Sequence, residues 1–245
     1  MSLQILLSGA SGAVGRVIGE AIEADSHFLL AGQASRRQFF EPDAEADVVI
    51  DFSHPELLAR VIQFAVRRRL PLVSGTTGLN PGLERKLEEA ATHIPVCHAA
   101  NFSLGVNLLV RLAAQTARAL NNGFDIEILE THHRRKLDAP SGTARRLGQV
   151  VSKARGLDFE SSAVHDRSSR RQPRHGDEIG YQAIRGGDVA GEHTVFFLAD
   201  GERLELTHRS TDRGVFARGA LAAASRITER KAGMVDFADL VLGTS

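Results

Sequence analysis

The sequence lacks the features of several protein classes, and each absence narrows the possibilities. Its 245 residues contain a single cysteine, Cys97, which excludes an internal disulfide and a cysteine-based zinc site and suits a reducing cytoplasm. The formal net charge is zero, so no global charge attracts nucleic acid or an anionic membrane. No apolar run approaches the roughly 20 residues that cross a bilayer, and the N-terminus lacks a signal-peptide pattern. We therefore expect a soluble cytoplasmic protein with no membrane, nucleic-acid or metal partner.

The first hundred residues alternate between strand-like and helix-like patterns. Short apolar runs without period-two alternation, typical of strands buried on both faces, occupy residues 3–7, 28–31, 48–52, 70–73 and 94–97. Helical patterns fill residues 14–24, 55–68 and 81–92. This alternation predicts an α/β domain with a Rossmann-type, doubly wound parallel sheet.

The pattern changes after Asn101. Helical patterns cover residues 104–120, 143–153 and 214–228, and strand-like patterns cover residues 124–131, 178–185, 192–198 and 203–209. These strands predict a second, α+β domain with a mixed or antiparallel four-stranded sheet. The polar, Arg-rich residues 160–178 predict a mobile, solvated loop or a subunit contact, and the apolar tail 235–242 is expected to pack back on the first domain.

A glycine-rich turn follows the first predicted strand and precedes a helix. Its residues are Gly9, Ala10, Ser11, Gly12, Ala13, Val14 and Gly15. Glycines at this spacing allow a tight turn and a close approach of backbone to a pyrophosphate, while the helix N-terminus supplies N–H groups. The context favours a dinucleotide site, and the alternative is a glycine-rich turn with only a structural role.

The residues after the second predicted strand indicate which dinucleotide is bound. An acidic residue usually holds the ribose there, but this chain has Ser35, Arg36 and Arg37. Guanidinium groups suit a 2′-phosphate, so we expect NADPH to be preferred over NADH. The alternative is a solvated loop. Residues at the ends of strands 4 and 5 are expected to line the nicotinamide side: Gly75, Thr76, Thr77, Ala99, Ala100, Asn101 and Phe102.

The segment ETHHRRKLDAPSGT, residues 130–143, places five residues that can be cationic before a predicted helix start. Ser141 can cap that helix, and the N–H groups of Gly142 and Thr143, with His133 and Lys136, would then form a trap for carboxylates. Strand alternation should direct His132 and His133 to different sides. We expect the substrate to supply the counter-charge. The alternative is a solvated basic face, which we expect for Arg134 and Arg135.

These motifs together resemble the dihydrodipicolinate reductase (4-hydroxy-tetrahydrodipicolinate reductase) family. The segments that carry the resemblance are GASGAVG, DFSHPE, GTTG, AANFSLGVN, ETHHRRKLDAPSGTA and GYQAIRGGDVAGEHTVFF. Membership implies reduction of a cyclic dicarboxylate by NADH or NADPH in the diaminopimelate route to lysine. It also implies a dinucleotide-binding domain of residues 1–101 and 214–245, a substrate-binding and oligomerisation domain of residues 102–213, and a homotetramer.

The resemblance also implies roles for individual residues. His132 would be the principal acid/base residue and Lys136 a proton donor that quenches the charge left by hydride transfer. The substrate carboxylates would be held by His133, Lys136, Ser141, Gly142 and Thr143. The dinucleotide would be contacted by residues 9–14, 75–77 and 99–102, with Ser35 and Arg36 at the ribose, while Arg213 and Phe216 would lie near the closing hinge. Ser35 departs from the acidic residue of many members, and the segment 36–46 is short.

Two other functions compete with this interpretation. A short-chain-type dehydrogenase needs a Tyr-x-x-x-Lys pair, but the only tyrosine is Tyr181 and Arg185 stands four positions later. A dinucleotide-sensing regulator, or a nucleic-acid binder using residues 160–178, would bind its ligand without turnover. The zero net charge and the scarcity of aromatic residues disfavour a nucleic-acid binder.

Overall fold

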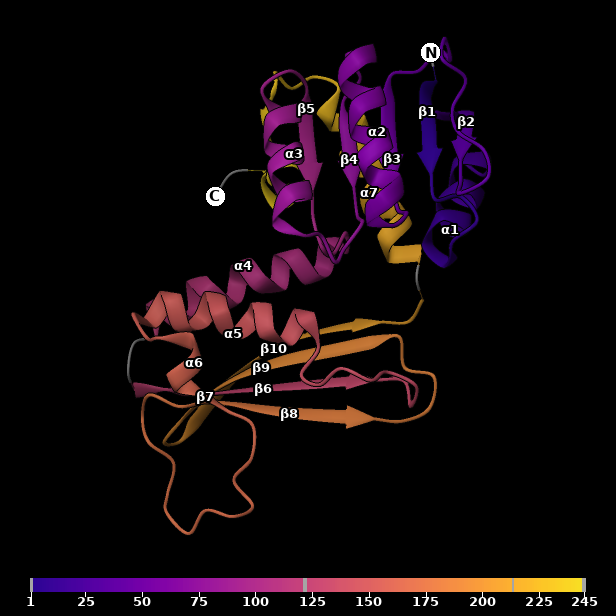
Figure 1. The fold of residues 1–245 in the computed structure, drawn as a ribbon. Coiled ribbons are helices and arrows are strands. Elements are labelled where there is room, and N and C mark those ends of the chain that lie inside the picture. The colour runs from indigo at the N-terminus through magenta and orange to yellow at the C-terminus, as the bar shows by residue number, and fades with distance from the viewer. Residues whose placement is uncertain (1, 121–122, 213, 244–245) are drawn as a thin grey trace. The chain divides into compact units, whose positions relative to one another are not determined.

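The computed structural model describes residues 2–120, 123–212 and 214–243. The chain divides into two compact units, one formed by Met1–Leu104 with Arg213–Ser245 and the other by Gly105–Asp212. Each unit contains one sheet (Figure 1). No helix within the described ranges is long and apolar enough to cross a membrane.

The first unit contains a parallel six-stranded sheet of order β11-β5-β4-β3-β1-β2. Its strands are β1 (Leu3–Ser8), β2 (Phe28–Ala34), β3 (Val48–Asp51), β4 (Leu72–Ser74), β5 (Pro95–His98) and β11 (Gly233–Met234). Its helices are α1 (Ala13–Glu23), α2 (Pro55–Arg68), α3 (Pro81–Ala91), α7 (Gly214–Ile227) and α8 (Phe237–Leu242). The predicted Rossmann-type sheet is confirmed, with the two-residue β11 as an additional strand.

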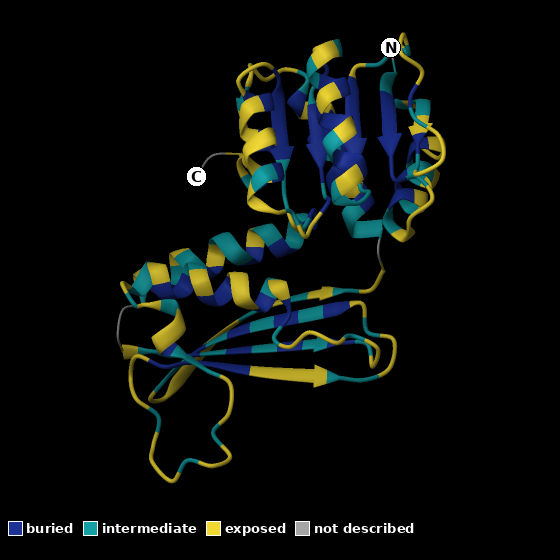
Figure 2. Cartoon of the chain, in the orientation of Figure 1, coloured by how far each residue is buried: buried dark blue, intermediate teal, exposed yellow. Residues whose placement is uncertain are grey.

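Helices cover both faces of this sheet because its central strands are apolar on both sides. Side chains of β1 alternate between two cores, with Leu7 packing toward α1 and α7 and Leu6 packing toward α2 and α3. β3 is therefore buried along its whole length, and so are the last four residues of β1 (Figure 2). The tail forms α8, whose Phe237 joins the α1 and α7 core, as predicted for residues 235–242.

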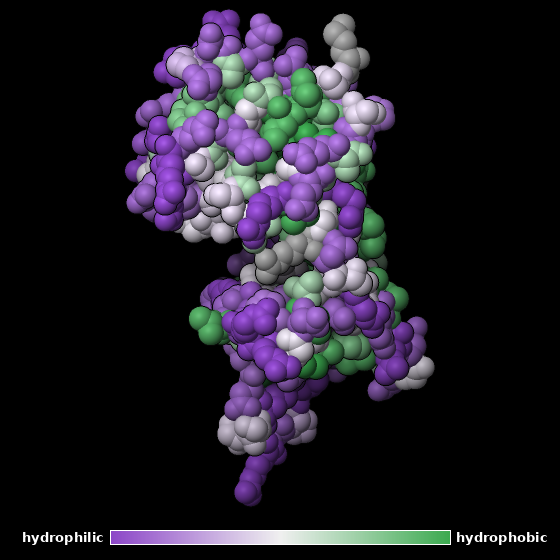
Figure 3. All heavy atoms as spheres, turned by 90° about the vertical axis from the view of Figure 1, so that its right-hand side faces the viewer, coloured by the Kyte–Doolittle hydropathy of each residue, from purple (hydrophilic) through white to green (hydrophobic). Residues whose placement is uncertain are grey.

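Exposed apolar side chains are scattered rather than concentrated. Those in the described ranges are Leu29, Leu108, Leu112, Leu137, Ile184, Leu204 and Met234. The face of the first unit in Figure 3 is mostly hydrophilic and carries one group of hydrophobic side chains. Leu29, which is 50% exposed, lies on β2 at the edge of the first sheet.

The second unit contains a mixed sheet of order β10-β9-β6-β8-β7. Its elements are α4 (Leu104–Ala119), β6 (Asp125–His132), α5 (Gly142–Arg155), α6 (Phe159–Ser162), β7 (Ala163–Val164), β8 (Ile179–Arg185), β9 (Gly191–Ala199) and β10 (Glu202–Ser210). β6 pairs antiparallel with β9 and parallel with β8. The four predicted strands are confirmed, and β7 is a fifth strand inside the segment predicted as a loop.

One face of β6 changes from apolar to polar along the strand. Ile126, Ile128, Glu130 and His132 alternate with half-buried residues and are all buried, so they share the face that packs against helices. Ile126 and Ile128 contact the core made with α4 and α5. Glu130 and His132 therefore lie on the same face as the hydrophobic core, beyond its last isoleucines.

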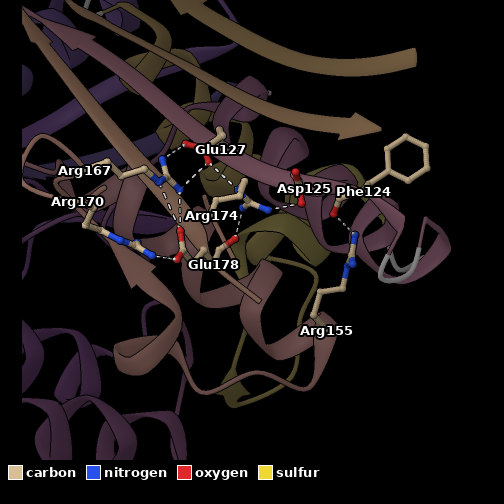
Figure 4. A network of polar contacts seen from close by, with 8 residues as sticks. All are labelled: Phe124, Asp125, Glu127, Arg155, Arg167, Arg170, Arg174 and Glu178. Atoms are coloured by element: carbon tan, nitrogen blue, oxygen red, sulfur yellow. Dashed lines mark hydrogen bonds and ion pairs between the residues drawn. The ribbon is translucent and has the colours of Figure 1, made fainter. Parts of the chain in front are cut away.

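Three arginines of residues 160–178 pair with acids on the opposite face of β6 and with Glu178, the residue before β8 (Figure 4). Arg167 donates two hydrogen bonds to the Glu127 carboxylate, at 2.8 and 3.0 Å. Arg170 donates to Glu178 at 2.7 Å, and Arg174 pairs with Asp125. The prediction of a solvated loop is wrong for these three arginines, because their guanidinium groups are bound to acids of the same unit.

Candidate active site

A cavity of about 550 Å³ lies in the first unit where β1, β2 and β3 end. Its lining residues are Gly9, Ser11, Gly12, Ser35, Arg36, Arg37, Phe52, Ser53, His54 and Leu57. The carboxyl ends of parallel strands are where open α/β sheets bind ligands, and the volume suits a small organic molecule. The structure thus brings the predicted glycine-rich turn and the predicted arginines together around one cavity.

The glycine-rich turn between β1 and α1 is shaped for close backbone approach. Gly9 has a φ of +82°, a conformation that favours glycine, and its carbonyl accepts the Gly12 N–H at 2.9 Å. A Cβ on Gly15 would collide with the Gly9 carbonyl, so glycine is required for the helix to start so near the strand. Gly12 caps α1 without a side-chain hydrogen bond, and the first-turn N–H groups create a region of positive potential.

The turn after β2 holds two guanidinium groups at the cavity. Ser35 Oγ accepts the backbone N–H groups of Arg37 and Gln38, each at 3.3 Å. Arg36 Nε donates to His54 Nε2 at 3.1 Å, which connects this turn to the loop after β3. No carboxylate is among the described residues that line the cavity. The donor set therefore suits an anion such as phosphate.

Asp51 organises the loops behind this cavity. It is fully buried at the end of β3, and its carboxylate accepts hydrogen bonds from the hydroxyls of Ser53 at 2.6 Å, Ser74 at 3.1 Å and Thr76 at 2.6 Å. Thr76 Oγ1 also accepts the Ser53 N–H at 3.0 Å. A buried carboxylate with these donors joins the ends of β3 and β4 into one rigid group.

The predicted nicotinamide-side residues occupy varied environments. Thr77 and Ala100 are exposed, and Gly75 packs so closely against the Phe52 ring that a Cβ would collide with it. The Thr76 side chain is buried and already bonded to Asp51. Ligand contacts through its hydroxyl are therefore not supported by the geometry.

Asn101 and Phe102, at the end of β5, are also engaged within the first unit. Asn101 Oδ1 accepts the Ser103 N–H at 2.8 Å. Phe102 is 1% exposed and packs edge-on against Phe52 and Phe237. Its ring is part of the core, so this side chain is engaged within the first unit. Phe216 is half-buried in α7, and Arg213 lies outside the described residues.

A polar cluster in the second unit is centred on Glu130, near the end of β6. Its carboxylate accepts hydrogen bonds from Nη1 and Nη2 of Arg185, both at 2.7 Å, and from the backbone N–H of Ser141 at 3.1 Å. His132 Nδ1 lies 2.5 Å from the same carboxylate. Glu130 is 1% exposed, so these contacts replace its solvation almost completely.

The protonation of His132 follows from these contacts. Burial lowers the pKa of His132, the Glu130 carboxylate opposes this change, and the charges of Lys136 and Arg185 lower the pKa further. Burial acts to raise the pKa of Glu130, but hydrogen bonds from Arg185, His132 and Ser141 outweigh it and the net pKa is lowered. A lowered pKa favours the neutral imidazole near neutral pH, and a neutral ring can donate Nδ1–H to Glu130 and leave Nε2 unprotonated.

Ser141 starts α5 and connects the cluster to β9. Its Oγ accepts the Ala144 N–H at 3.2 Å, so the predicted N-cap is confirmed. The same oxygen lies 3.0 Å from Nε2 of His193, and burial lowers the pKa of His193 to about 4. A neutral His193 ring can accept the Ser141 hydroxyl at Nε2 or donate its own Nε2–H to Ser141 Oγ, depending on its tautomer. Both partners of the Ser141 side chain are protein atoms. Gly142 is more open than Ser141, since a Cβ on Gly142 would meet none of the described residues within 4 Å.

The other members of the basic segment separate as the alternation predicted. His132 is buried and His133 is half-buried, while Arg134 and Arg135 are exposed. His133 Nδ1 is a buried nitrogen with no hydrogen-bond partner in the described part of the chain. Lys136 forms a 2.8 Å ion pair with Asp138. Part of the counter-charge that was expected from the substrate therefore comes from the protein, since Asp138 pairs with Lys136.

The geometry does not support the short-chain-type alternative. Tyr181 is 4% exposed, and burial raises the pKa of its hydroxyl to about 12. Arg185, four residues later, is bound to Glu130 instead of activating the phenol. The nucleic-acid alternative also loses support, because Arg167 and Arg170 are already paired with acids.

In the ranges that the structure describes, no group of His, Cys, Asp and Glu is arranged to hold a metal ion.

Several residues of these clusters were not predicted from the sequence: Asp51, His54, Glu130, Arg185 and His193. Asp51 and His54 belong to DFSHPE, and Glu130 begins ETHH, so each lies inside a motif without having been assigned a role. The available signal was the two-residue spacing of Glu130 and His132, which places both on one strand face. Their cross-strand partners required the register of the sheet.

Comparisons with known proteins cover both units. Residues 3–102 match the family model described as "Dihydrodipicolinate reductase, N-terminus" and residues 105–241 match "Dihydrodipicolinate reductase, C-terminus". The 4-hydroxy-tetrahydrodipicolinate reductase of Akkermansia muciniphila is 42% identical over 244 residues, covering 99% of each chain. That of Pseudoalteromonas translucida is 40% identical over 255 residues, covering 95% of this chain and 96% of the relative.

A solved structure shares the fold. The dihydrodipicolinate reductase from Paenisporosarcina sp. TG-14, solved with bound dipicolinate, has a TM-score of 0.78 and 20% identity, covering 96% of this chain and 98% of that chain. At this level of identity the likeness concerns the fold alone. Both units are therefore represented in one solved chain of the same architecture.

Proposed function

The chain belongs to the dihydrodipicolinate reductase family, and on that premise we propose that it catalyses the NAD(P)H-dependent reduction of 4-hydroxy-tetrahydrodipicolinate to tetrahydrodipicolinate. This reaction belongs to the diaminopimelate pathway of lysine biosynthesis. The observation that carries the proposal is the full-length match to relatives of that name, combined with a buried Glu130–His132 pair next to the start of α5.

The first unit fits a nicotinamide dinucleotide, which supplies the hydride when it is bound. The N-terminus of α1, which has no side-chain cap, offers first-turn N–H groups to a pyrophosphate, and the Gly9–Gly12 turn brings the backbone close to it. We assign Gly9, Ala10, Ser11, Gly12, Ala13 and Val14 to this contact. We also assign the backbone of residues 75–77 and 99–102 to the cofactor, since several of their side chains are engaged elsewhere.

We further propose that NADPH is preferred over NADH. Arg36 and Arg37 line the cavity, Ser35 replaces a ribose-binding acid, and the bond to His54 orients the Arg36 guanidinium. Arg36→Ala should lower kcat/KM with NADPH by about 10-fold or more while leaving that with NADH nearly unchanged, because a charged hydrogen bond contributes about 1.5–3 kcal/mol. Arg85→Ala, on the exposed face of α3, is the control. Equal efficiency with both cofactors before and after the Arg36 substitution would contradict the preference.

In the second unit, we propose that His132 and Lys136 handle protons and that the start of α5 holds the substrate. The unpartnered Nδ1 of His133 and the open space beside Gly142 support a carboxylate site formed by His133, Lys136, Gly142 and Thr143, which Ser141 supports as the cap. A dianionic substrate would raise the pKa of His132, which burial lowers in its absence. Protonated His132 could then donate a proton from Nε2.

We also propose a homotetramer that works in the cytoplasm. In the second unit, α4 and α5 pack on the same face of the sheet, and the opposite face carries Ile184, which is 49% exposed. Covering that face with another subunit would bury such side chains. Light scattering should give four times the 26.5 kDa chain mass. A monomer at micromolar concentration would contradict this assembly.

The reaction itself can be tested directly. The purified protein is mixed with NADPH and freshly generated 4-hydroxy-tetrahydrodipicolinate, and the loss of NADPH absorbance is followed. We expect substrate-dependent oxidation that His132→Gln reduces by at least about 100-fold, the usual scale of acid–base catalysis. A folded protein that binds NADPH but does not oxidise it would favour the dinucleotide-sensing regulator instead.

A further inference from the structure

We propose that Glu130 is the positioning residue of this site: its carboxylate holds the His132 ring so that Nε2 transfers the proton, and it ties that ring to the start of α5. The inference rests on the proposed reduction and identifies the group through which His132 would be oriented. Glu130 itself is buried behind His132 and Ser141 and is not proposed to touch the substrate.

The sheet register brings the members of this group to one face. Glu130 and His132 are two residues apart on β6, so their side chains point the same way. Arg185 of β8 is the register partner of His132, and His193 of β9 is the register partner of Glu130. Neighbouring strands in a sheet direct paired side chains to the same side. Three strands thus place an acid, two imidazoles and a guanidinium together.

Glu130 has more contacts than a structural ion pair needs. Arg185 alone, with two bonds of 2.7 Å, would neutralise the carboxylate. The additional bonds connect it to His132 Nδ1 at 2.5 Å and to the Ser141 N–H at 3.1 Å. One carboxylate therefore sets both the orientation of the imidazole and the position of the helix start proposed to bind substrate. Such an arrangement favours the Nδ1–H tautomer of a neutral histidine.

The opposite side of the His132 ring is kept open by a glycine. A Cβ on Gly191 would lie 3.1 Å from His132 Nε2 and 3.4 Å from Cδ2. A side chain at that position would crowd the nitrogen that the Glu130 bond leaves available. The ring is thus held at Nδ1 by Glu130. Its Nε2 is not covered by a side chain from position 191, because that residue is glycine.

The charges around His132 give the variant a defined pH signature. The titratable or charged groups facing it are Glu130 on its own strand, Arg185 on β8, His193 on β9 and Lys136 in the following loop. Glu130 is the only anion among these four, so it alone stabilises the imidazolium. Its replacement by a neutral amide should lower the pKa of His132. A rate that needs protonated His132 would then decline at a lower pH than in the wild type.

The first experiment uses the wild-type protein and needs no turnover. Nitrogen-15 NMR of the histidine rings, with the His132 signals identified by their loss in His132→Gln, reports which nitrogen carries the proton. We expect the Nδ1–H tautomer above the pKa of His132. A dominant Nε2–H tautomer would overturn the proposal, whether or not any variant folds.

The second experiment compares Glu130→Gln with a matched control. Glu127→Gln breaks a similar two-bond pair with Arg167 on the same strand but on the opposite face. We expect Glu130→Gln to lower kcat by about 10- to 100-fold, to change KM much less, and to move the high-pH decline of kcat to lower pH. Glu130→Asp, which keeps the charge, should restore the pH profile of the wild type, and Glu127→Gln should keep both rate and profile.

The outcomes separate this inference from the proposed reduction. A wild-type protein without turnover contradicts the reduction, even if NMR shows the Nδ1–H tautomer. A wild-type protein with turnover, together with a folded Glu130→Gln whose kcat and pH profile match those of Glu127→Gln, overturns the role of Glu130. Circular dichroism establishes folding, and if Glu130→Gln does not fold, the wild-type tautomer decides the question.

Discussion

The stability contribution of Glu178 can be worked out from its contacts with the arginines shown in Figure 4. Its pKa is lowered from 4.5 to about 2, mainly by the hydrogen bond from Arg170, against the opposing effect of burial. At about 1.4 kcal/mol per pKa unit, that difference corresponds to an upper limit of about 3.5 kcal/mol. The side chains of Arg167 and Arg170 are 29% and 26% exposed, so solvent screening reduces the expected value to about 2 kcal/mol.

The sign of the pH dependence follows from the lowered pKa. The stabilisation is fully present above the unfolded-state pKa of 4.5 and is lost as the pH falls toward about 2. Urea unfolding of the wild type and Glu178→Gln, followed by circular dichroism, should give a difference of about 2 kcal/mol near neutral pH that shrinks by more than half by about pH 3.

A matched control isolates the buried pair from general surface effects. The Glu160 carboxylate is 79% exposed and lies 3.7 Å from Arg145, so Glu160→Gln should change the free energy of unfolding by less than about 0.5 kcal/mol. Equal stability of Glu178→Gln and the wild type at neutral pH would refute the reasoning. So would a difference that stays constant down to about pH 3, because a charge effect must weaken there.

Three further substitutions test other parts of the structure. Lys136→Ala removes both a proposed proton donor and a carboxylate partner, so steady-state kinetics should show a lower kcat and a higher substrate KM, and unchanged constants would contradict the site. Asp51→Asn weakens the bonds from the Ser53 and Thr76 hydroxyls, which position the loops after β3 and β4. Fluorescence titration should show NADPH affinity lowered by about 3- to 10-fold, because only part of the energy of these bonds, about 1.5–3 kcal/mol each, is lost with the charge. Unaltered affinity would contradict a role for these loops in cofactor binding. Gly148→Ala places a Cβ against the Tyr181 hydroxyl inside the second unit. Thermal unfolding should show that the free energy of unfolding falls by about 1–3 kcal/mol. Unchanged stability would contradict the steric clash.

The sequence predicted most regular elements because their signals are local. The helix from Pro55 to Arg68 was predicted with both observed ends: proline occupies its first turn, and Arg69 takes a left-handed conformation after its last. The apolar runs of the first sheet were recognisable because both faces are buried. β7 and β11 were missed because two-residue strands, such as Gly233–Met234, carry no periodicity and depend on the neighbouring strand.

The candidate site was predicted only in part. The glycine-rich turn, Arg36 and the basic segment were identified, since local motifs carry them. Glu130 was not, because its importance depends on Arg185 and Ser141, which are 55 and 11 residues away. The pairing of Arg167 and Arg174 was missed for the same reason, because their acids lie 40 and 49 residues away. Tertiary pairing, which no local pattern encodes, decides which charges remain available.

The discontinuity of the first unit has a consequence for synthesis of the chain. Helix α7 packs against α1, β3, β4 and β5, and Ala220, Ala224 and Ile227 are part of the core on that side. A nascent chain that ends before Gly214 therefore lacks one of the helices that cover this face of the first sheet, while all of Gly105–Asp212 has already been made. During synthesis, the first unit could therefore complete its fold only after the second unit, Gly105–Asp212, had emerged from the ribosome.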